Sequence, residues 1–206
     1  MRIIVITSDN YRHLMPEFAE RFNRYWGKVD ITCLCYQVPP VLPDNFEIVS
    51  LGEQPANGDW TSGLRGWFES LVDSRFILLL DDYMLTDKVD VGIVDQIMQS
   101  VWSDEAPLFQ CVKFDLTTDR KNFPHEYCYG LPCIIESNQD ARYRTSLQVA
   151  AWDKHYFLKF LVPGRTPWEF ELLGEKEAMN DGAVILGTTC GVVKYENRML
   201  KGKVKA

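Results

Sequence analysis

Short apolar runs that alternate with helix-like segments constrain the fold of this chain most. Runs of aliphatic and β-branched residues, typical of buried strands, occupy residues 2–7, 30–36, 46–51 and 75–80. Segments 14–26 and 60–72 carry apolar residues at three- and four-residue steps, which predicts amphipathic helices. This alternation predicts an α/β fold with a mostly parallel central sheet and helices on both faces.

The second half of the chain continues the pattern less regularly. The spacing of apolar residues predicts helices over 91–102, 146–161 and 169–180, and strands over 108–114, 184–187 and 192–195. Residues 121–133 are irregular and aromatic, and the tail after Asn197 is basic. Because no linker or internal repeat interrupts the chain, we expect a single domain over 1–206.

The composition limits which binding partners and which cellular compartment we expect for this protein. A formal charge of −7 argues against nucleic-acid binding, which needs a basic face. The N-terminal apolar run is too short for a signal peptide, and no apolar stretch reaches the roughly 18 residues of a membrane span. We therefore expect a cytoplasmic protein, with peripheral membrane contact left open, whose six cysteines are reduced thiols: Cys33, Cys35, Cys111, Cys128, Cys133 and Cys190.

The most apolar predicted strand ends in two acids, Asp81 and Asp82. Ligands of open α/β sheets bind beyond the carboxyl ends of the strands. Two adjacent carboxylates repel each other there, and a divalent cation such as Mg²⁺ relieves that repulsion while binding phosphate oxygens. The pair therefore points to a metal–diphosphate site, although a solvated strand end with Asp82 capping the next turn is the simpler alternative.

Four blocks of sequence resemble, in order, the GT-A-fold glycosyltransferases. They are Thr7-Ser8-Asp9-Asn10-Tyr11, Asp59-Trp60-Thr61-Ser62-Gly63-Leu64, the Leu-Leu-Leu-Asp-Asp-Tyr run at 78–83, and Ser146-Leu147-Gln148 followed by Pro167-Trp168-Glu169-Phe170-Glu171. The blocks span nearly the whole chain. The metal-dependent GT-A pattern is Asp-x-Asp, whereas this chain has Tyr83 in the third place.

The resemblance implies transfer of a sugar from a nucleotide-diphosphate-sugar to an acceptor hydroxyl on a glycan or lipid-linked acceptor. It implies a nucleotide-binding half over about 1–115, an acceptor-side half over about 116–206, and a Mn²⁺ or Mg²⁺ ion held by Asp82. The donor would be bound by Thr7, Ser8, Asp9, Tyr11, Trp60, Ser62, Leu64, Arg65, Asp81 and Lys201. The acceptor would be bound by Trp168 and Gln148, and the catalytic base would be Glu169 or Glu171, with Glu169 slightly preferred.

Each of these residues also has a simpler structural explanation. Ser8 or Asp9 can cap a helix, Trp60 can staple one, and two glutamates in a first helical turn gain from the helix dipole. Two other functions also stay open: a non-catalytic carbohydrate- or nucleotide-binding protein, and a nucleotidyltransferase. The nucleotidyltransferase is disfavoured because the loop after the first strand, residues 7–10, contains no glycine.

Overall fold

A nine-stranded sheet forms the centre of the molecule. The computed structural model describes residues 1–102, 110–128, 133–200 and 203–204. In spatial order the strands are β3 (Phe46–Ser50), β2 (Ile31–Cys35), β1 (Arg2–Ile6), β4 (Arg75–Leu80), β9 (Ala150–Asp153), β6 (Cys111–Asp115), β10 (Val184–Thr188), β8 (Ile134–Ser137) and β7 (His125–Tyr127).

The strands of this sheet run mostly in one direction. β1 pairs in parallel with β2 and β4, β2 with β3, and β6 with β10. β9 lies antiparallel between β4 and β6, and β8 lies antiparallel between β10 and β7. Two strands therefore oppose the other seven, which confirms the predicted mostly parallel sheet.

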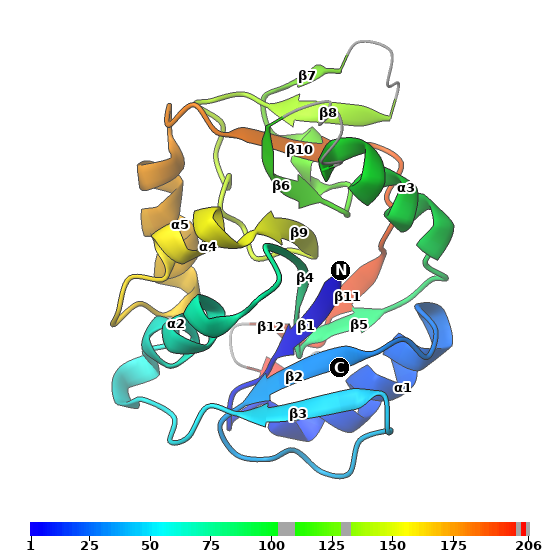
Figure 1. The fold of residues 1–206 in the computed structure, drawn as a ribbon, viewed down its shortest axis with the longest axis vertical. Helices are drawn as coiled ribbons and strands as arrows, with labels where there is room; N and C mark the ends of the chain where they lie inside the picture. Colours follow the sequence, from blue (N-terminus) through cyan, green and yellow to red (C-terminus); the bar gives the residue numbers. More distant parts are fainter. Residues whose placement is uncertain (103–109, 129–132, 201–202, 205–206) are drawn as a thin grey trace.

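Helices cover both faces of the sheet. Along β1, Ile3 and Val5 face one core cluster, shared with α1 (Met15–Tyr25) and α3 (Val91–Trp102). The alternate residues Ile4 and Ile6 face a second cluster, shared with α2 (Thr61–Ser70), α4 (Lys154–Phe160) and α5 (Pro167–Ala178). Figure 1 shows the two groups of helices on opposite sides of the strands. The predicted placement of helices is thus confirmed, and it follows from the period-2 alternation of strand side chains.

The C-terminal segment returns to the strand that follows the two acids. β11 (Tyr195–Asn197) pairs antiparallel with β5 (Tyr83–Leu85), so that Asn197 lies opposite Tyr83 (Figure 1). The chain continues into the short strands β12 (Met199–Leu200) and β13 (Lys203–Val204). Single 3₁₀ turns, η1 (Arg12–Leu14), η2 (Ala56–Gly58) and η3 (Asp119–Asn122), complete the elements.

The helix predicted over 146–161 is wrong in its first part. Residues 150–153 form β9, and the helix begins only at Lys154, where the Asp153 carboxylate accepts the backbone N–H of Tyr156 at 3.0 Å. Ala150, Ala151 and Trp152 are fully buried between β4 and β6, and a strand buried on both faces has no alternating pattern to distinguish it from a helix.

Two predicted strands differ in their limits. β11 begins at Tyr195, where the strand predicted over 192–195 was to end, because its pairing with β5 sets its position. The strand predicted over 108–114 begins at Cys111 among the described residues, and Leu108 and Phe109 lie outside them.

The prediction of six reduced cysteines is wrong for two of them. Cys133 and Cys190 form a disulfide, with Cα atoms 5.9 Å apart, a separation that suits such a bond. The pairing of β8 with β10 brings them together, since Ile134 lies opposite Thr188. Cys33, Cys35, Cys111 and Cys128 are free and buried. Within the described residues, every helix falls short of the length and apolarity needed to cross a membrane.

Candidate active site

A cleft of about 860 Å³ opens where β1 and β4 end. Its residues come from both halves of the chain, so the sheet brings together segments that are far apart in sequence. Residues on the β1–β4 side include Ser8, Tyr11, Trp60, Asp82 and Tyr83, which the C-terminal Tyr195, Asn197 and Met199 join. Those on the other side include Asp115, Asp119, Arg120, Tyr143, Ser146, Gln148, Trp168 and Glu171.

The two adjacent acids differ in what they contact. Asp81 is buried, and its carboxylate accepts the backbone N–H of Ser8 at 3.3 Å, which links the end of β4 to the loop after β1. Burial raises the Asp81 pKa to about 7, although a hydrogen bond from the Thr7 side chain opposes the rise. Asp81 therefore shapes the loop behind the cleft, while Asp82 lines the cleft itself.

Asp82 lines the cleft, and few groups around it offset its negative charge. Burial raises its pKa to about 6, against hydrogen bonds from its own backbone and that of Met199. Its backbone carbonyl accepts the N–H of Arg198 at 2.8 Å, so the returning C-terminal segment fixes its position. The two acids in turn add to the effect of burial in raising the pKa of Tyr11. The site therefore favours a positively charged group beside Asp82.

The residues at Asp82 suit a metal ion that takes most of its ligands from elsewhere. Among the described residues, no group of three or more His, Cys, Asp or Glu side chains is arranged to hold a metal ion. A cation such as Mg²⁺ needs only one or two protein carboxylates when phosphate and water oxygens complete its coordination. Asp82 can supply one such oxygen, whereas Asp81 is engaged with Ser8.

An aromatic pair that the sequence did not reveal lines the cleft next to Asp82. The rings of Tyr83 and Tyr195 stack with their centroids 4.3 Å apart. Burial raises the pKa of both phenols well above the ordinary value, so both rings stay neutral. The residue that breaks the Asp-x-Asp pattern, Tyr83, is thus half of a stacked wall formed by the pairing of β5 with β11.

Glu171 is the acid that α5 places at the opposite side of the cleft. Its carboxylate accepts the backbone N–H of Leu147 at 2.6 Å, and burial raises its pKa. Glu169, in contrast, closes a capping box with Thr166: each accepts the other's backbone N–H, at 2.9 and 3.2 Å. The structure therefore puts Glu171, and not the slightly preferred Glu169, among the residues of the cleft.

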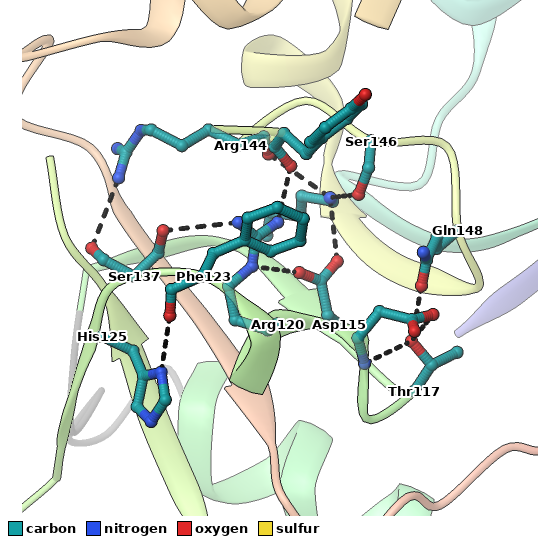
Figure 2. Close-up of polar contacts among 12 residues, drawn as sticks. Asp115, Thr117, Arg120, Phe123, His125, Ser137, Arg144, Ser146 and Gln148 are labelled. Carbon is teal, nitrogen blue, oxygen red and sulfur yellow. Dashed lines mark hydrogen bonds and ion pairs between the residues drawn. The ribbon is translucent and has the colours of Figure 1, made fainter. Parts of the chain in front are cut away.

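A buried ionic network supports this side of the cleft. Asp115 contacts Lys113 Nζ through Oδ1 and Arg120 Nε through Oδ2, both at 2.8 Å (Figure 2). Burial alone would raise the Asp115 pKa, but the two cations hold it below the ordinary value, while burial lowers the Lys113 pKa to about 8. Arg120 also donates to the carbonyl of Tyr143 at 2.7 Å, which fixes the loop that carries Tyr143 into the cleft.

This network was not predicted above, although the sequence carries one signal of it. Lys113 and Asp115 stand two places apart in a strand, so they share one face. Charged residues on the covered face of a strand are rare unless they are paired. Their partner, Arg120, lies on the following 3₁₀ turn, a contact that strand periodicity does not predict.

Several residues predicted to bind the donor lie elsewhere. Thr7 is buried behind the cleft, and the Asp9 carboxylate accepts the N–H of Gln37 at 2.8 Å. The Ser62 hydroxyl accepts the N–H of Gly164 at 3.2 Å. Leu64 is a core residue of α2, and Arg65 donates to the carbonyl of Leu161 and pairs with Glu69. Lys201 lies outside the described residues.

Comparisons with known proteins place the fold. No family model matches the sequence, and no curated protein matches it. The crystal structure of S. aureus TarS 1–349 is similar, with a TM-score of 0.57 and 9% identity over 95% of this chain; the UDP complex has a TM-score of 0.57 and 8% identity. This chain spans 60% of those structures. At such identities the similarity shows the fold alone, and it agrees with the predicted α/β class.

A second group of solved structures is less similar. CMP:2-keto-3-deoxy-manno-octonic acid synthetase complexed with CTP has a TM-score of 0.48 and 14% identity, and covers 90% of this chain and 88% of its own. A similarity at this level supports no inference about function.

Proposed function

We propose that this protein transfers a sugar from a nucleoside-diphosphate-sugar to an acceptor hydroxyl. The observation that carries the proposal is that one cleft is lined both by Asp82, which follows β4, and by Glu171 on α5. Separated carboxylates let one bind a cation while the other handles a proton. The TarS complex shows that a similar fold holds UDP, which supports the proposal as an analogy of fold.

The charges of the cleft support a metal-bound diphosphate. Arg120 is the one Lys or Arg side chain among the described residues that line it, and its guanidinium is engaged by Asp115. A diphosphate in a cleft that also contains Asp82, Asp119 and Glu171 therefore requires an added positive charge. We propose that Asp82 would hold a Mn²⁺ or Mg²⁺ ion, which would supply positive charge for the diphosphate leaving group.

Glu171 is proposed as the general base. A base works best when its pKa lies near the working pH, and burial moves the Glu171 pKa in that direction. The Leu147 N–H holds its carboxylate in place. Trp168, whose side chain is 63% exposed at the rim, offers a flat apolar surface for the acceptor, and Gln148 offers an amide. We propose that Ser8 and Tyr11, which also line the cleft, contact the nucleoside.

A thermal-shift panel tests this function. UDP, GDP, dTDP and CMP are titrated into the protein with and without Mn²⁺, because a ligand that binds the native state raises the melting temperature. We expect one nucleoside diphosphate to raise it, and Mn²⁺ to increase the shift. In Asp82→Asn the metal-dependent part should vanish, whereas Asp44→Asn, at an exposed acid outside the cleft, should keep it.

The same panel separates the alternatives. No shift with any nucleotide at millimolar concentration excludes the proposed donor. A nucleotide-sugar that binds without being hydrolysed or transferred indicates a carbohydrate- or nucleotide-binding protein that keeps the fold. A metal-dependent shift that survives in Asp82→Asn removes Asp82 from the metal site.

A further inference from the structure

A second cavity, of about 440 Å³, adjoins the cleft. The two are adjacent, because both are lined by Asp119, Gln148, Tyr195 and Asn197. The second cavity adds Thr117, Thr118, Val193 and Lys194. The cleft alone is already near the upper end of the range of roughly 300–1,000 Å³ for a ligand site. The extension therefore provides room beyond that needed for the proposed donor.

Hydrogen-bonding groups with unused capacity stand at the junction of the two cavities. The buried Thr117 hydroxyl donates to Gln148 Oε1 at 2.7 Å and lies 3.3 Å from Asp119 Oδ2 (Figure 2). The hydrogen bond from Thr117 orients the Gln148 amide and leaves Gln148 Nε2 without a hydrogen-bond partner among the described residues. Within the same residues, Asp119 Oδ1 has no hydrogen-bond partner either. An amide donor and a carboxylate acceptor that line the same cavity match the hydroxyl groups of a sugar.

The surroundings of this junction favour a neutral ligand. Lys194 Nζ is paired with Asp87 at 2.7 Å, and Asp119 adds a negative charge. Asp119 would therefore repel an anionic unit. Among the described residues of the cavity, no unpaired cation offsets that repulsion. The Tyr195 ring, held by its stack on Tyr83, supplies an apolar surface that reaches both cavities.

We propose that the second cavity is a subsite for a further sugar unit of the acceptor, and that the acceptor is a neutral oligosaccharide of two or more units. The reacting unit lies in the cleft near Glu171, and the next unit lies between Gln148, Asp119 and the Tyr195 ring. This inference rests on the proposed function, since it takes the cleft as the place of transfer.

A glycan array tests the subsite. The protein, saturated with whichever nucleoside diphosphate stabilises it, is applied to neutral and acidic glycans of one to six units. We expect binding to neutral glycans of two or more units. Thr118 and Lys194 line the second cavity but not the cleft, so we expect Thr118→Trp and Lys194→Trp to obstruct the cavity and to weaken that binding by about tenfold or more. Lys121→Trp, at an exposed residue outside both cavities, should leave it unchanged.

The outcomes distinguish this inference from the function it rests on. If no nucleoside diphosphate binds, the proposed function fails. If a nucleotide binds but the array shows only monosaccharides, only acidic glycans or nothing, the subsite is overturned. It is also overturned if whichever of the two cavity-filling variants folds, as judged by near-ultraviolet circular dichroism, still binds like Lys121→Trp.

Discussion

Glu169 and Glu171 stand two places apart on α5 and therefore point about 200° apart around the helix axis. One turns toward the N-terminus of the helix and completes its capping box; the other turns into the cleft. Which of the two can take a proton from an acceptor depends on where the helix sits on the sheet, and not on the local sequence.

We predict that Glu171→Gln lowers the rate of sugar transfer by about 100-fold or more. The amide keeps the shape of the side chain and can still accept the Leu147 N–H, but it cannot take a proton. The thermal shift produced by whichever nucleoside diphosphate stabilises the protein should persist. Glu169→Gln is the matched control, because glutamine also serves in a capping box, and it should keep full transfer activity. Equal losses in both variants would argue against Glu171 as the base.

The raised pKa of Asp81 predicts how the free energy of unfolding depends on pH. Because burial raises its pKa from 3.8 to about 7, the folded protein holds a proton that the unfolded chain releases between these pH values. The contribution of Asp81 to the free energy of unfolding is thus constant below pH 3.8, falls as the pH rises from there to about 7, and is constant again above that.

We therefore predict that Asp81→Asn stabilises the protein at pH 8, by a few kcal/mol at most, since each unit of pKa shift corresponds to about 1.4 kcal/mol. Asparagine can still accept the Ser8 N–H. The gain should shrink toward zero near pH 4. Urea denaturation at the two pH values measures it, and a gain that is the same at both would show that ionisation of Asp81 is not the cause.

At the scale of elements, the β5–β11 pair completes the cleft. It carries Tyr195 and Asn197 into the wall, and the Arg198 N–H reaches the carbonyl of Asp82 from the same segment. The segment that carries β11 thereby positions Asp82, which follows β4 and lies more than a hundred positions earlier in the chain.

We predict that Glu196→Pro abolishes nucleotide binding while leaving the main sheet folded. Glu196 lies opposite Met84, and proline removes the N–H that an antiparallel pair needs. Glu196→Ala is the control: it loses only a partly exposed ion pair with Arg21, which contributes little. Circular dichroism and the thermal shift with the stabilising nucleoside diphosphate provide the measurements. Normal nucleotide binding by Glu196→Pro would mean that β11 is not needed for the donor site.

At the scale of the whole molecule, the disulfide between Cys133 and Cys190 fastens the β8 side of the sheet. We predict that Cys190→Ser lowers the free energy of unfolding by about 2–4 kcal/mol under oxidising conditions, because the bond closes a long loop in the unfolded chain. Cys128→Ser, at a cysteine that is free, serves as the control. Thiol titration of the denatured, unreduced protein should find the four free cysteines and not six.

Local patterns were sufficient to predict the alternation of strands and helices in the first half of the chain, because each element there carries a complete period of its own. Residues 2–7, 75–80 and 14–26 show periods that depend only on their own side chains. The position of Asp82 at a strand end, and hence at a ligand-binding edge, followed from the same local reasoning.

The other features became clear only from the way the elements pack, because they depend on contacts that local periodicity does not encode. β9 is a strand since β4 and β6 enclose it, and Cys133 meets Cys190 since β8 pairs with β10. The stack of Tyr83 on Tyr195, the Asp115–Arg120 pair and the choice of Glu171 over Glu169 each join residues whose neighbours along the chain give no sign of the contact. Local periodicity encodes which face of an element is buried, whereas the packing of elements decides which polar side chains share a cleft.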